Sequence, residues 1–151
     1  MQYLKDSMGW VGYQIAKRVV FQSGCEVLPE VNTEAGFFGL EAKDIDGNLL
    51  KVSDLQGKWK GFLIVNVATQ WGLAKSHYEQ MVALDKELAG RGLKIIGFPC
   101  NQCKAQEPGT DAEIKTTVTE KYGVKFQMMS KIDVNAQHVH PVFAWLRRSS
   151  D

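Results

Sequence analysis

The sequence predicts a single α/β domain built around a parallel strand–helix–strand unit. Two apolar segments rich in β-branched residues, 62–67 and 94–98, are typical of central strands that are covered on both faces. A segment with apolar residues at helical spacing lies between them, and this order predicts a right-handed parallel crossover. The chain has 151 residues, of which 44% are hydrophobic, and this suits one compact core.

An amphipathic helix is predicted at the beginning of the chain. Residues 2–21 carry apolar side chains at spacings of three and four, whereas 22–35 have no sustained period and are typical of a linker. We therefore divide the chain into an N-terminal docking extension, 1–35, and a domain, 36–151. A helix that packs on its own domain is the alternative. The residues expected to contact a partner are Trp10, Tyr13 and Phe21.

The domain begins with a predicted β-hairpin. A strand signal runs from Phe38 to Asp44, residues 45–48 form a turn, and 49–52 form the returning strand. Residues 53–57 then form a short helical turn that ends at a glycine.

Three helices are predicted within the domain. The helix between the two central strands ends at residues 90–92, which contain two glycines. Thr110 and Glu113 match a capping box that begins the second helix, and Pro141 is suited to the first turn of the third. The residues expected to face inward are Met81, Leu84, Leu88, Ile114, Val118, Tyr122, Val142, Trp145 and Leu146.

Charge and cysteine content exclude several classes of function. The 18 basic and 17 acidic residues give a net charge of +1, so no overall field favours nucleic acid or an anionic membrane. No apolar run approaches the roughly 18 residues that a membrane span needs. The three cysteines, Cys25, Cys100 and Cys103, are too few for a secreted disulfide framework, which favours a reducing compartment.

Three strings identify a family resemblance. Asn66-Val-Ala-Thr-Gln-Trp71 ends the first central strand, Phe98-Pro-Cys-Asn-Gln102 ends the second, and Gln106-Glu-Pro-Gly109 follows. Together they resemble the glutathione peroxidases over roughly residues 36–148. The resemblance implies a thioredoxin-like fold of the glutathione peroxidase type, with the β-hairpin before the βαβ core. We expect the C-terminal hairpin and last helix of that fold to be truncated, and the N-terminal helix to be an addition.

Residue 71 decides the chemistry that we expect. In the resembling family this position holds a peroxidatic cysteine or selenocysteine, and an indole cannot attack a peroxide bond. Gln106 matches the glutamine that surrounds the nucleophile, whereas the family's tryptophan and asparagine have no counterpart in this sequence. Thr119 occupies the position of the resolving cysteine. The sequence therefore predicts a pseudoenzyme without peroxidase activity, in which Trp71, Gln106 and Thr119 are vestigial.

The function expected on these grounds is that of a structural or accessory subunit of a larger assembly. Other protein subunits would be its partners, and no cofactor, metal, nucleic acid or small-molecule substrate is expected. In that role Trp71 either fills the former active-site depression or anchors a partner. The basic, apolar N-terminal helix favours a mitochondrial location, with the cytoplasm as the alternative.

Two alternatives keep redox chemistry. In the first, the chain is an active glutathione- or thioredoxin-dependent peroxidase whose UGA codon for selenocysteine has been written as Trp71. Such a selenoenzyme would not need a resolving cysteine at position 119. In the second, Cys100 and Cys103 form a Cys-x-x-Cys redox couple, although thioredoxin-type motifs follow the first central strand and not the second.

A zinc site is a further possibility for the same cysteines. Cys100 and Cys103 could combine with His138 and His140 as a Cys₂His₂ ligand set. However, His140 and Pro141 match a His-Pro string of the resembling family, so a packing role is the favoured interpretation and no metal is expected.

Overall fold

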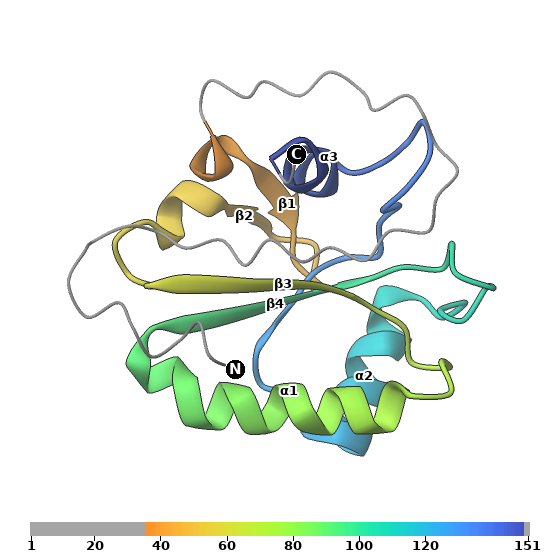
Figure 1. Cartoon of the computed structure of the whole chain (residues 1–151). Helices are drawn as coiled ribbons and strands as arrows, with labels where there is room; N and C mark the ends of the chain where they lie inside the picture. The colour runs from red at the N-terminus through yellow and green to blue at the C-terminus, as the bar shows by residue number, and fades with distance from the viewer. Residues whose placement is uncertain (1–35, 150–151) are drawn as a thin grey trace.

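The computed structural model describes residues 36–149, and its centre is a three-stranded sheet with the order β3-β4-β5 (Figure 1). Strand β3 (Gly61–Val67) pairs in parallel with β4 (Leu93–Pro99), and helix α1 (Ala74–Leu88) connects them. The register runs from Gly61 opposite Leu93 to Val67 opposite Pro99. The predicted parallel βαβ unit is therefore confirmed.

Strand β5 (Gln127–Met128) was not predicted. It has only two residues, too few for any alternation in the sequence, and it pairs in parallel with Ile96 and Gly97 of β4. The close approach needs a residue without a side chain at position 97, because a Cβ there would lie 2.8 Å from the sulfur of Met128.

Helices cover both faces of the sheet. Helices α1 and α2 (Asp111–Tyr122) lie on one face, and α3 (Pro141–Arg148) lies with the hairpin on the other (Figure 1). Each face has its own apolar cluster, since alternate residues of a strand point in opposite directions. Ile96 of β4 belongs to the cluster with α3, and Ile95 belongs to the cluster with α1 and α2.

The helix boundaries follow their capping residues. Thr110 accepts a hydrogen bond from the backbone of Glu113, and the Glu113 side chain accepts one from the backbone of Thr110, which confirms the capping box. Gly123 ends α2 at a φ of 69°, in the left-handed region that glycine tolerates. The N-cap of α3 is His140, whose Nδ1 accepts from the amide of Val142, with Pro141 following as predicted.

The N-terminal hairpin is formed, but it begins later than predicted. Strands β1 (Glu41–Lys43) and β2 (Leu49–Lys51) pair antiparallel, and a 3₁₀ turn, Phe37–Gly39, occupies the start of the strand that was expected from Phe38. The turn buries the Phe37 ring against Phe62 at 5.2 Å and Trp145 at 5.6 Å between centroids. The chain turns here because burial of this aromatic ring stabilises the fold more than an extended start of the strand would.

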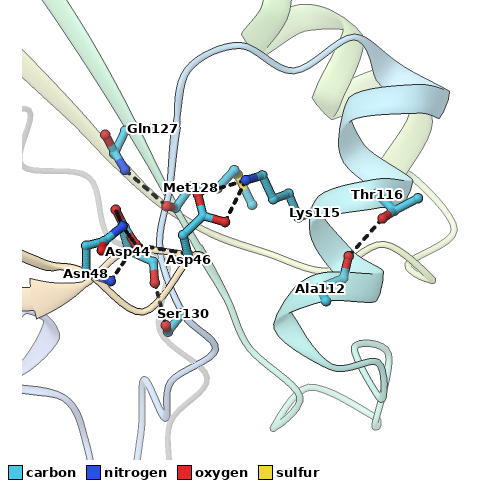
Figure 2. Close-up of polar contacts among 9 residues, drawn as sticks. All are labelled: Asp44, Asp46, Asn48, Ala112, Lys115, Thr116, Gln127, Met128 and Ser130. Atoms are coloured by element: carbon cyan, nitrogen blue, oxygen red, sulfur yellow. Dashed lines mark hydrogen bonds and ion pairs between the residues drawn. The ribbon is translucent and has the colours of Figure 1, made fainter.

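Side chains tie the tip of the hairpin to the rest of the domain (Figure 2). The carboxylate of Asp44 accepts hydrogen bonds from the amides of Asp46 and Asn48, which closes the turn. Lys115 of α2 pairs with Asp46 at 2.6 Å, and the hydroxyl of Ser130 donates to the Asp44 carbonyl at 2.6 Å. These contacts connect the turn both to α2 and to the segment after β5.

The proposed docking extension, including Trp10, Tyr13 and Phe21, lies outside the described residues. Among residues 36–149, no helix has the length and apolar character needed to cross a membrane. Within the same range, β3 has a strand partner on one side only, because it is the end strand of its sheet.

Candidate functional site

Position 71 lies at the carboxyl end of β3, in the turn that leads into α1. The carbonyl of residue 71 accepts a hydrogen bond from the amide of Ala74 at 2.9 Å, and Leu73 is the N-cap of the helix. The side chain of Trp71 is 41% exposed. The residue at position 71 is therefore open to solvent and directly precedes a helix N-terminus, where backbone amides favour an anion.

The loop that follows β4 lies against this turn. The amide of Gln70 donates to the carbonyl of Gln106 at 3.1 Å, and the amide of Cys100 donates to the carbonyl of Val67 at 3.0 Å. The backbone of Gln106 thus lies against the residue that precedes position 71. Thr119 is an exposed residue in the last turn of α2, and no described contact joins it to Trp71.

The residue that sequence reasoning missed is Glu107. Its side chain is completely buried, with 0% exposure. One carboxylate oxygen accepts from the Thr69 amide at 2.7 Å, and the other accepts from the Thr69 hydroxyl at 2.5 Å. Burial raises the pKa of Glu107, and the two hydrogen bonds from Thr69 oppose that shift. The only signal in the sequence was the Gln-Glu-Pro-Gly string itself.

The backbone around Glu107 is held just as firmly. Its amide donates to the side chain of Asn101 at 2.8 Å. The ammonium group of Lys131 donates to the carbonyls of Glu107 at 3.2 Å and Gly109 at 2.6 Å. The amide of Lys131 in turn donates to Asp111 in the first turn of α2. The carboxylate therefore belongs to a rigid segment that is anchored to β4 and α2.

The indole of Trp71 lies at the surface of the turn. Its ring lies against the imidazole of His77, with centroids 4.6 Å apart and an interplanar angle of 67°. Leu73, beside it, is 55% exposed. The turn consequently presents an apolar surface with one histidine next to position 71.

The two described cysteines, Cys100 and Cys103, are unpaired in this structure. Cys100 is 1% exposed, and its sulfur accepts from the amide of Gln102 at 3.5 Å. Burial raises the pKa of the Cys100 thiol, which disfavours the reactive thiolate. The Gln102 side chain accepts from the amides of Val134 and Asn135, so this turn serves to join two loops.

The alternative zinc site is not formed. Within residues 36–149 no group of three or more His, Cys, Asp or Glu side chains could hold a metal ion. The two histidines lie apart from the cysteines, beside an open depression on the surface. It is lined by Asn101, Lys131, Ile132, Asp133, His138 and His140.

Residues 37–147 match the family model described as glutathione peroxidase. The chain belongs to the glutathione peroxidase family. This confirms the resemblance inferred from the three strings. The solved structure of T. cruzi GPX1 is 28% identical, with a TM-score of 0.53 over 71% of this chain and 61% of that one. The predicted fold class, α/β and thioredoxin-like of the glutathione peroxidase type, is thereby confirmed.

Two curated members of the glutathione peroxidase family illustrate the similarity. The phospholipid hydroperoxide glutathione peroxidase of Sus scrofa is 44% identical over 108 residues, which cover 70% of this chain and 52% of that protein. The thioredoxin/glutathione peroxidase of Escherichia coli is 46% identical over 101 residues, which cover 67% and 54%. The chain spans about half the length of the curated relatives it matches.

These relatives correct the prediction that the chain is not an enzyme. Proteins that are 44% and 46% identical to it are named as peroxidases, which points to an enzyme and contradicts the description as a pseudoenzyme and accessory subunit. That prediction gave most weight to Trp71, although the surrounding framework retains the peroxidase strings.

Proposed function

We propose that this chain is a peroxidase that reduces hydroperoxides with a thiol as the reductant, and that its reactive atom is the selenium of a selenocysteine at position 71. The observation that carries the proposal is the location of residue 71. It is an exposed residue at the carboxyl end of β3, ahead of the first turn of α1 and beside the loop of Gln106. The names of the curated relatives support the same reaction class.

The environment of position 71 suits an anionic nucleophile. Backbone amides in the first turn of α1 stabilise negative charge. A selenolate there would attack one oxygen of the hydroperoxide and break the O–O bond. Selenium is oxidised by two electrons to a selenenic acid, and the departing oxygen takes a proton to become an alcohol or water.

Two thiols would then restore the selenolate. The first condenses with the selenenic acid to release water and form a selenenyl sulfide, and the second displaces the first as a disulfide. External thiols make a resolving cysteine unnecessary, which agrees with the threonine at position 119. Glutathione and thioredoxin appear in the names of these relatives, and we propose the same class of thiol as the reductant here.

An indole at position 71 has little structural purpose. A tryptophan normally stabilises a fold by burying its large apolar surface, whereas Trp71 is 41% exposed and, among residues 36–149, its one ring contact is with His77. Selenocysteine is encoded by UGA, and the same codon is read as tryptophan in some genetic codes. A selenocysteine codon translated in this way would produce the observed letter without any change in the surrounding framework.

The decisive experiment is intact-mass and selenium analysis of the protein purified from its native source. We expect one selenium atom per chain, assigned to position 71 by peptide sequencing, and hydroperoxide consumption that depends on added thiol. In parallel, the recombinant chain with Trp71→Cys should gain peroxide consumption over the chain that contains Trp71. An ordinary indole at position 71 in the native protein, or no peroxide consumption by the cysteine variant, would overturn the proposal.

A further inference from the structure

The buried carboxylate of Glu107 demands an explanation, because glutamate is almost never fully buried unless it is paired. Desolvation of a carboxylate is unfavourable, and this is offset only when hydrogen bonds replace those lost to water. Both oxygens of Glu107 find those bonds on a single residue, Thr69, which supplies its amide and its hydroxyl. Thr69 precedes position 71 by two residues.

The segment that carries Glu107 is held by more hydrogen bonds than the turn that carries Thr69. Glu107 sits in a segment that is held by Asn101 and by Lys131, whose ammonium group donates to the carbonyls of Glu107 and Gly109. The turn between β3 and α1 has fewer attachments. Besides the bonds within the turn, it is held by the Gln70 amide and by the pair of bonds from Thr69. The carboxylate thus holds the short turn between β3 and α1 against the segment that carries Glu107.

We propose that Glu107 is a positioning residue, whose carboxylate holds Thr69 through two hydrogen bonds and thereby keeps residue 71 ahead of the first turn of α1. This inference rests on the proposed function, because it assigns a purpose to the position of the reactive atom. It requires no contact between Glu107 and the substrate. Its effect on residue 71 is exerted through the backbone of the turn.

The proposal makes a prediction whose sign separates it from a simple charge effect. If Glu107 acted as a nearby negative charge, its removal would favour an anion at position 71 and lower the pKa of a thiol there. If it acts by holding the turn, its removal lets residue 71 move away from the helix N-terminus. The pKa of the thiol then rises toward its ordinary value of about 8.5.

The test uses the full chain with Trp71→Cys, and it follows alkylation of the introduced thiol by iodoacetamide across a pH range. Glu107→Gln preserves the shape of the side chain but cannot accept both hydrogen bonds from Thr69. Thr69→Val keeps the carboxylate and removes only the hydroxyl donor, and Thr69→Ser restores that donor. Alkylation of the three native cysteines, Cys25, Cys100 and Cys103, is followed separately by peptide mass analysis.

We expect the apparent pKa of the introduced thiol to rise in Glu107→Gln, to rise less in Thr69→Val, and to return in Thr69→Ser. Each unit of increase slows alkylation near neutral pH by about tenfold, because only the thiolate reacts. Val142→Ala in α3, on the opposite face of the sheet, serves as the control for loss of stability alone (Figure 1). It should lower the unfolding temperature and leave the alkylation profile unchanged.

A lower pKa in Glu107→Gln, or an unchanged profile in both Glu107→Gln and Thr69→Val, would overturn the proposal. If Glu107→Gln does not fold, Thr69→Val and its serine counterpart decide the matter. The measurement does not use peroxide, so it is independent of the proposed activity. A shifted alkylation profile in a protein that consumes no peroxide would reject the proposed function and retain the positioning role.

Discussion

The imidazole ring of His77 lies 4.6 Å from the indole of Trp71, measured between ring centroids. His77 belongs to the first turn of α1, where its amide donates to the carbonyl of Leu73 at 3.1 Å. The backbone of the helix therefore holds this imidazole close to position 71. Any reactive group introduced at that position has a histidine as its neighbour.

The first prediction concerns this histidine. In the Trp71→Cys chain, His77→Asn should raise the pKa of the introduced thiol, because a nearby protonated imidazole stabilises a thiolate. We expect alkylation at mildly acidic pH to slow several-fold, on the order of the effect of a modest pKa shift. His138→Asn, an exposed histidine beside the depression described above, is the matched control and should change nothing. Equal rates in the two variants would rule out a role for His77.

The second prediction concerns the hydroxyl of Tyr78, a buried polar atom that has no hydrogen-bond partner among residues 36–149. Burial and the neighbouring charge of Glu107 both raise the pKa of Tyr78, so the phenol stays protonated with its donor unused. Tyr78→Phe should leave the free energy of unfolding unchanged or increase it by up to about 1 kcal/mol. The ring stacked on Tyr122, 4.8 Å between centroids, is retained. Urea denaturation is the measurement, and clear destabilisation would mean that the hydroxyl has a partner.

The third prediction compares two glycines in the same sheet. A Cβ at Gly97 would lie 2.8 Å from the sulfur of Met128, whereas a Cβ at Gly61 would lie 3.9 Å from Leu93, an ordinary contact. Gly97→Ala should therefore reduce the free energy of unfolding by about 1–3 kcal/mol through overpacking. Gly61→Ala should be neutral or slightly stabilising. Similar losses in the two variants would show that the packing of β5 on β4 is not the cause.

The fourth prediction is a pH dependence of stability. Burial lowers the pKa of His140 from its ordinary value of 6.5, and Nδ1 must be unprotonated to accept from the amide of Val142. Because the folded state favours the neutral form, this stability is fully present above pH 6.5 and is lost as the pH falls through the lowered value. His140→Asn keeps an N-cap acceptor that does not titrate.

Urea denaturation of both proteins at about pH 7.5 and about pH 5.5 tests this. The His140→Asn variant should lose less stability between the two pH values than the parent chain does. A comparison within each protein removes any constant effect of the substitution on packing against Phe98. An identical loss in both proteins would assign the pH dependence to other groups.

Much of the fold could be predicted because it rests on local and repetitive signals. Three such signals span only a few residues each: the β-branched run of β3, the capping box at Thr110 and Glu113, and Pro141 at the start of α3. The predicted start of β1 was wrong because the burial of Phe37 depends on aromatic rings that are distant in the sequence. Pairing of β5 could not be predicted, since a two-residue strand has no pattern of its own.

The candidate site was predicted only in part. Gln106 was expected near position 71 only because it matches the glutamine of the resembling family, and the structure joins its carbonyl to the amide of Gln70. The hydrogen bond between Glu107 and Thr69 joins residues 38 positions apart, and neither segment has a sequence pattern that indicates a fully buried carboxylate. His77 was missed because a histidine on an exposed helical turn is ordinary until its neighbour is known.

The position of β3 at the end of its sheet also affects residue 71. This strand delivers residue 71 at its carboxyl end, and within residues 36–149 one of its long edges is open to a further strand. A polypeptide segment that adds to that edge would damp fluctuations of the strand on which the reactive residue depends. On the proposed function, the rate per molecule would then depend on protein concentration, and a dilution series would measure that dependence.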